Sequence, residues 1–97
     1  MAYGLVLVFD GVSEEDYWSV NEKLGIGRDG LGDYPPGLLV HSGGPVENGW
    51  LVSEIWDAKP SHEAFMAGRL GAALEAAGVG HPTQVIETET VNFQKLG

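Results

Sequence analysis

The sequence contains no cysteine, which excludes disulfide bonds, thiolate zinc sites and cysteine nucleophiles. This absence suits the reducing cytoplasm, where we expect the protein to work. Basic residues are also scarce, since five Lys and Arg stand against fourteen Asp and Glu, and the formal net charge is -9. Such a charge repels phosphate backbones and anionic lipids, so we expect neither nucleic acid nor a membrane surface as a partner.

Long apolar runs are missing as well. No segment approaches the ~20 apolar residues that cross a bilayer. The apolar N-terminal stretch lacks the basic region and the cleavage site of a signal peptide, and we interpret it as a strand. The chain has 97 residues, 43% of them hydrophobic, which predicts one globular domain over residues 1–97.

The pattern of apolar residues and turn signals predicts six elements in the order βαββαβ. Strands are predicted within residues 3–9, 37–43, 49–57 and 83–93, and helices over residues 14–24 and from Asp57 as N-cap to Gly78. Ser13 begins the first helix as N-cap, and Asn48-Gly49 is a strong hairpin signal. This order is typical of an α+β, ferredoxin-like fold: an antiparallel four-stranded sheet with two helices on one face.

Gly25, Gly27 and Gly30 match the G-x-G-x-x-G pattern of dinucleotide-binding proteins. That pattern binds a pyrophosphate where a strand leads into the N-terminus of a helix. Here the glycines follow a helix and lead through two prolines into a strand, so a nucleotide site is not expected. We interpret residues 25–37 as a mobile lid over a pocket, with a plain linker as the alternative.

The first strand is apolar on both faces, with Tyr3, Leu5, Leu7 and Phe9 on one and Val6 and Val8 on the other. Two helices cover only one face of a four-stranded sheet. The second face would leave a large apolar patch exposed on a monomer, so the sequence predicts a homodimer.

Candidate site residues occur on the first helix and on the second strand. Tyr17 and Asn21 share the inward stripe of the helix with two aliphatic residues. A buried amide needs a partner, so Asn21 either binds loop backbone or is available to a ligand. His41 stands in an otherwise apolar strand, where it is either a base that takes and returns a proton or a hydrogen-bonded sheet histidine.

The third strand carries Trp50, Glu54 and Trp56 on one face. Glu54 has three alternatives open to it: to orient His41, to act as a base, or to form an ion pair at an interface. His62 lies at the edge of the buried stripe of the second helix, as a pocket residue or a packing residue. The histidines are too widely spaced for a metal motif, and we expect no metal and no cofactor.

The segment PPGLLVHSGGPVENGWLVSEIWDAKPSHEAFMAGRLGAAL, together with the βαββαβ order, resembles the dimeric α/β-barrel superfamily. Within it the chain is similar to the small antibiotic-biosynthesis-monooxygenase-like proteins, and most to an uncharacterised bacterial group of that type. The resemblance covers nearly the whole chain. It implies two sheets packed face to face in a homodimer, with a pocket between each sheet and its own helices. The superfamily includes cofactor-independent monooxygenases, polyketide cyclases, lactone isomerases and haem-degrading enzymes.

Two hypotheses about function follow. The first is a cofactor-independent monooxygenase-like or cyclase-like enzyme that acts on a small aromatic or polyketide-like molecule. Its catalytic residues would be His41 as proton shuttle, Tyr17 and Asn21 as substrate or oxyanion contacts, and Glu54, with pocket walls from Trp50, Trp56 and His62. The alternative is a non-catalytic homodimer that binds a small ligand or has a structural role.

Overall fold

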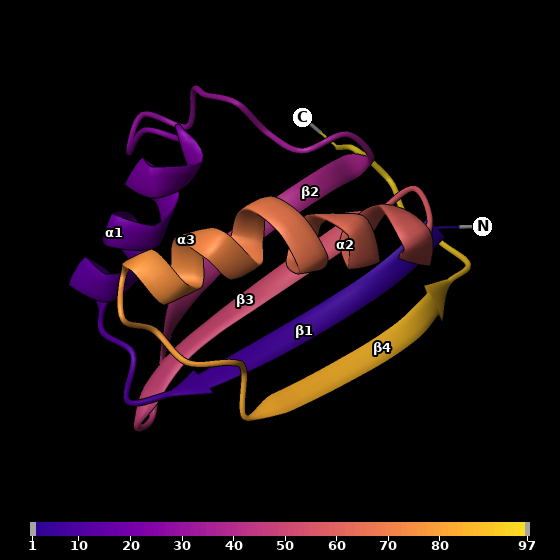
Figure 1. Cartoon of the computed structure of the whole chain (residues 1–97). Helices are drawn as coiled ribbons and strands as arrows, with labels where there is room; N and C mark the ends of the chain where they lie inside the picture. The colour runs from indigo at the N-terminus through magenta and orange to yellow at the C-terminus, as the bar shows by residue number, and fades with distance from the viewer. Residues whose placement is uncertain (1, 97) are drawn as a thin grey trace.

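The computed structural model describes residues 2–96 and contains one four-stranded antiparallel sheet in the order β2-β3-β1-β4. The elements along the chain are β1 (Ala2–Asp10), α1 (Glu14–Leu24), β2 (Leu38–Val46), β3 (Gly49–Trp56), α2 (Lys59–Phe65), a π-helical turn η1 (Met66–Leu70), α3 (Gly71–Ala76) and β4 (Gln84–Thr90). The helices all lie across one face of the sheet (Figure 1). The predicted ferredoxin-like α+β fold is confirmed.

Helix α1 has the ends that its sequence predicts. The Ser13 hydroxyl accepts a hydrogen bond from the backbone N–H of Asp16 at 3.1 Å, and the Asp16 carboxylate accepts one from the backbone N–H of Ser13 at 3.0 Å. These reciprocal bonds form a capping box. Gly25 ends the helix in the left-handed region at φ 79°, which glycine adopts without strain.

The second helical segment differs from its prediction in two respects. Its N-cap is Ala58, not Asp57, and the Asp57 carboxylate instead accepts a hydrogen bond from the Ser61 hydroxyl at 2.6 Å. The segment is also not one regular helix, since the π-helical turn η1 separates α2 from α3. Such π-bulges rotate the side chains that follow around the helix axis, and they often occur near functional sites.

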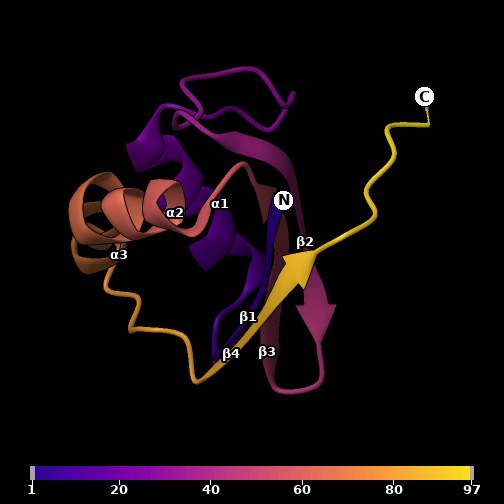
Figure 2. The same cartoon turned by 90° about the vertical axis from the view of Figure 1, so that its right-hand side faces the viewer.

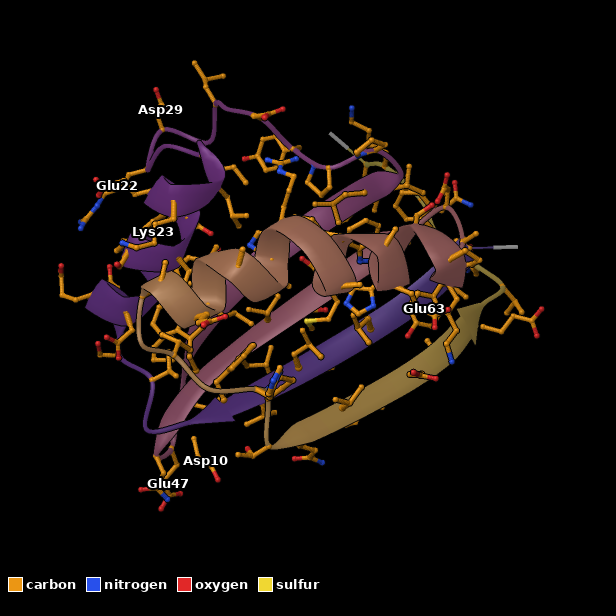
Figure 3. The ribbon with its side chains drawn as sticks, in the orientation of Figure 1. Asp10, Glu22, Lys23, Asp29, Glu47 and Glu63 are labelled. Atoms are coloured by element: carbon orange, nitrogen blue, oxygen red, sulfur yellow. The ribbon has the colours of Figure 1, made fainter. Side chains whose placement is uncertain are left out.

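The core lies between the helices and the inner face of the sheet. Every second residue of β1 and β3 is buried there, and the helices contribute a buried stripe. The apolar core consists of Tyr3, Leu5, Leu7, Phe9, Val20, Leu24, Trp50, Val52, Trp56, Phe65, Ala73 and Leu74. Charged side chains such as Asp10, Glu22, Asp29 and Glu47 lie at the periphery, away from this core (Figure 3). The interior is therefore apolar except where specific polar side chains enter it.

The outer face of the sheet carries apolar side chains that no other described element covers. Val6 and Val8 are partly exposed, Val40 is 40% exposed and Ile86 is 50% exposed. Figure 2 shows the helices on one side of the sheet, while the chain after β4 extends away from it. Within residues 2–96, no helix is both long and apolar enough to cross a membrane.

Candidate functional site

Glu54 is the one buried acid among the fourteen, all of which lie within residues 2–96. It stands on the inner face of β3, directly opposite His41 in β2. Its Oε2 lies 2.7 Å from His41 Nδ1, and its Oε1 accepts a hydrogen bond from Trp56 Nε1 at 3.0 Å. Both carboxylate oxygens are therefore hydrogen-bonded, as a buried charge requires.

This contact fixes the tautomer of His41. A carboxylate only accepts hydrogen bonds, so the proton of the neutral imidazole lies on Nδ1 and Nε2 carries the lone pair. The Tyr17 hydroxyl lies 2.5 Å from Nε2, and with the ring neutral it is the donor of this hydrogen bond. Tyr17, His41 and Glu54 thus form one continuous chain of hydrogen bonds, which we call the Tyr17 relay.

The Tyr17 hydroxyl stays protonated at neutral pH. Burial raises the pKa of Tyr17 above its ordinary value of 10.0, and the negative charge of Glu54 raises it further, whereas the side-chain amide of Asn21 opposes the shift. A protonated hydroxyl is what the hydrogen bond to His41 Nε2 needs.

The Tyr17 ring is held by aromatic neighbours. It stacks on Trp50, with the two ring centroids 5.0 Å apart, and lies nearly parallel to the His41 ring. Gly43 in β2 leaves room for it, because a Cβ atom there would stand 2.9 Å from Tyr17 Cζ. A glycine inside a strand often marks the close approach of another group. The sequence does not say that this group is the Tyr17 ring.

The Tyr17 relay borders a cavity of about 70 Å³ between the sheet and the helices. Apolar side chains form most of the wall, and the polar lining residues include Tyr17, Asn21, His41 and Glu54. These same residues, Glu54 excepted, also line an open cleft of about 460 Å³ that leads outward along β2 and the glycine-rich loop. Tyr17 and His41 therefore border both the cavity and the open cleft.

The loop over residues 25–37 forms part of this wall, through Tyr34 and Pro35. Arg69, in η1, binds this loop: its Nη2 donates to the backbone oxygens of Leu24 at 3.0 Å and Asp33 at 2.6 Å. The role of Arg69 is not predicted from the sequence, because its partners Leu24 and Asp33 are far away along the chain.

All four predicted catalytic residues, His41, Tyr17, Asn21 and Glu54, line the cavity, and Trp50 forms part of its wall. The Asn21 side chain is 7% exposed and makes no hydrogen bond to loop backbone within residues 2–96. Of the two alternatives for Asn21, the structure does not show the bond to loop backbone; the amide lies beside the Tyr17 hydroxyl, with which it forms a side-chain hydrogen bond.

Trp56 and His62 are not among the residues that line the cavity or the cleft, and of the two alternatives for His62 the structure favours the packing residue. Trp56 is fully buried, and its ring centroid lies 5.7 Å from that of Phe65. Its indole N–H donates a hydrogen bond to Glu54. His62 packs against Trp56 and Tyr3, with ring centroids 5.4 Å and 6.0 Å away. Burial lowers the pKa of His62 below 6.5, which keeps the ring neutral. In residues 2–96, no cluster of three or more His, Cys, Asp or Glu side chains is arranged to hold a metal ion.

Comparison with known proteins gives similarity at the level of structure. No family model and no curated protein sequence matches the chain. A solved structure named as a candidate antibiotic biosynthesis monooxygenase from Chloroflexus aurantiacus J-10-fl matches with a TM-score of 0.70 at 16% identity, over 100% of both chains.

Two further solved structures agree. The protein YJCS matches with a TM-score of 0.66 at 8% identity, over 93% of this chain and 99% of its own. A candidate antibiotic biosynthesis monooxygenase from Deinococcus radiodurans matches with a TM-score of 0.55 at 14% identity, over 100% of this chain and 99% of its own. The chain thus has the fold of the antibiotic-biosynthesis-monooxygenase-like proteins, as its sequence resemblance predicts.

Proposed function

We propose that the protein is a cofactor-independent enzyme that removes a proton from a small aromatic or polyketide-like molecule, as a monooxygenase or a cyclase would. The observation that carries this proposal is the Tyr17 relay at the edge of an apolar cavity. An apolar pocket with a few convergent polar groups is the usual form of a small-molecule site. The solved structures of the same fold that are named as candidate monooxygenases give the proposal further support.

The relay moves a proton in two linked transfers. The Tyr17 oxygen accepts a proton from an acidic O–H or C–H group of the bound molecule, while the Tyr17 proton passes to His41 Nε2. The imidazolium that forms keeps its Nδ1–H on Glu54, whose negative charge stabilises it. The resulting ion pair forms inside the protein, where charge interactions are stronger than in water.

The ionised substrate then has two routes. In a monooxygenase reaction, a ring CH2 group becomes a carbonyl as dioxygen supplies one oxygen atom to the product and one to water, with all electrons from the substrate. In a cyclase reaction, the carbanion closes a ring onto a carbonyl and the proton returns from His41 through Tyr17. Both routes need the base and neither needs a bound cofactor.

A test of this function compares the wild-type protein with Tyr17→Phe on a panel of polycyclic phenols that carry a ring CH2 group. The variant keeps the ring packing and loses the hydroxyl that begins the relay. We expect turnover to fall by about 100-fold or more, measured as oxygen consumption and, by mass spectrometry, as ring closure. Equal turnover in the two proteins would remove the relay from the mechanism.

We also propose that the working form is a homodimer in the cytoplasm. The exposed apolar outer face of the sheet, which includes Val40 and Ile86, supports the dimer, and the lack of cysteine suits a reducing compartment. Sedimentation at micromolar concentration should give about twice the 10.3 kDa of one chain. Val6→Lys on this outer face should give monomers, and a wild-type monomer would contradict the dimer.

A second candidate function is a non-catalytic homodimer that binds a small ligand. It is favoured by the observation that Tyr17, His41 and Glu54 already form hydrogen bonds with one another. Such bonds can hold the fold together without any role in a reaction. A ligand that binds equally to wild type and to Tyr17→Phe, with no turnover of the phenol panel, would favour this function.

A further inference from the structure

Trp50 holds a polar atom that the Tyr17 relay does not use. Its side chain belongs to the buried core and is 5% exposed, yet within residues 2–96 its Nε1 has no hydrogen-bond partner. Buried N–H donors nearly always have an acceptor, and an exception calls for an explanation. Because Trp50 lines both the cavity and the open cleft, a ligand is the natural source of that acceptor.

The position of this donor relative to Tyr17 is set by Gly43. The point where a Cβ atom of Gly43 would stand lies 3.0 Å from Trp50 Nε1 and 3.0 Å from the Tyr17 hydroxyl oxygen. The two polar atoms are therefore no more than twice that distance apart. A single oxygen atom bridges two groups over such a span or less, since hydrogen bonds of these types are about 2.7 to 3.0 Å long.

The two atoms have opposite requirements. The indole N–H of Trp50 only donates. The Tyr17 oxygen has committed its own proton to His41 Nε2, so toward the cavity it only accepts. An atom that serves both must accept one hydrogen bond and donate another. A hydroxyl group does so, whereas a carbonyl or ether oxygen only accepts and a methyl group does neither.

We propose that Trp50 Nε1 and the Tyr17 hydroxyl form a subsite for a single hydroxyl group carried by a small aromatic or enolic ligand. The ring of the ligand would occupy the apolar cavity beside Trp50. The subsite rests on the proposed function for the class of ligand. When the hydroxyl proton passes to Tyr17 and the Tyr17 proton to His41, the N–H of Trp50 stays on the ionised oxygen, and the one proton that the ligand loses is the one that His41 gains.

The test uses 4-nitrophenol and 4-nitrotoluene, which differ only by a hydroxyl in place of a methyl group of similar size. Trp50→Phe keeps an aromatic ring against Tyr17 and removes the N–H. We expect this variant to bind 4-nitrophenol about tenfold or more weakly, while its affinity for 4-nitrotoluene changes by less than about twofold. Equal weakening of both probes, unchanged binding of both, or no binding of 4-nitrophenol to the wild type would overturn the subsite.

A second measurement needs no variant to fold. In the ¹⁵N-labelled wild-type protein, the indole N–H resonance of Trp50 should move on addition of 4-nitrophenol and stay in place with 4-nitrotoluene; the reverse pattern, or no movement, contradicts the proposal. The phenolate absorbance band of the bound probe reports proton transfer separately. A moved indole signal without ionisation retains the subsite and rejects the relay, and ionisation without the indole shift does the opposite.

Discussion

Two groups of side chains in this molecule have the same residue types and different chemistry. Tyr17, His41 and Glu54 form one group, and Tyr3, His62 and Glu87 form the other. The two glutamates lie on either side of β1, since Glu54 in β3 and Glu87 in β4 both pair with Leu5. Trp56 joins the two groups, since its N–H bonds to Glu54 while its ring packs edge-on against His62.

In the first group the imidazole bridges the tyrosine and the glutamate. In the second the His62 ring packs against Tyr3 and its Nε2 has no partner within residues 2–96, so no relay passes through it.

The glutamates differ as well. Glu54 is buried, whereas Glu87 is exposed and lies 3.2 Å from Lys59 Nζ, which with the Tyr3 hydroxyl lowers its pKa. Tyr3 in turn has its pKa raised to about 12, by burial and by its hydrogen bond to Glu87. Neither His62 nor Glu87 borders the inner cavity. A histidine can act as a base here only where its ring bonds to both the tyrosine and the glutamate and lies beside a cavity for substrate. The same three residue types without that arrangement do not form such a site.

The largest expected difference between the two groups is in proton transfer. His41→Gln keeps an amide that can donate to Glu54 and removes the ring nitrogen Nε2 that faces Tyr17, so ionisation of a bound phenol should fall by about 100-fold. His62→Gln is the matched change in the other group and should leave it within about twofold. The measurement is phenolate formation by bound 4-nitrophenol; a similar loss in both variants would show that the two histidines act through stability and not through chemistry.

A second expected difference concerns folding stability. Glu54→Gln replaces the buried acceptor of two hydrogen bonds with an amide that satisfies only part of them, and should lower the free energy of unfolding by about 1 to 3 kcal/mol. Glu87→Gln changes an exposed carboxylate and should leave the urea midpoint almost unchanged. Should the Glu87 variant prove the less stable, the burial argument for Glu54 would be wrong.

The smallest expected effect is a pH dependence from His62. Its pKa is lower in the folded protein than the 6.5 of an unfolded chain, mainly through desolvation, although Glu54, Glu63 and Glu87 act against this and Lys59 adds to it. As pH falls below about 6.5, His62 binds a proton in the unfolded chain but stays neutral in the folded protein. The free energy of unfolding therefore decreases until the pH reaches the pKa of His62 in the folded protein. In urea unfolding between pH 7 and pH 5, His62→Gln should lose less stability than the wild type. A loss of the same size in both would assign the dependence elsewhere.

The sequence predicts the Tyr17 relay better than it predicts the surroundings of His62. The capping signals around Ser13 and Gly25 and the alternation in β3 place Tyr17, Asn21 and Glu54 on inward faces, because both rules depend on local geometry. Alternation gives the face of a side chain and not what covers it.

Trp50 and Trp56 share one face, yet only Trp50 borders the cavity. Phe65 and His62 pack over Trp56, and their placement depends on where the second helix begins. The sequence favours Asp57 as N-cap and carries no local signal for the π-helical turn, so it leaves open whether His62 is a pocket residue or a packing residue.

The central claim, that His41 stands ready to receive a proton from Tyr17, can be measured directly by ¹⁵N NMR of the His41 imidazole. The account predicts a neutral ring protonated at Nδ1 and not at Nε2 in the free protein, which changes to a ring protonated at both nitrogens when 4-nitrophenol binds. A free ring protonated at Nε2, or a ring unchanged by the bound phenol, would contradict it.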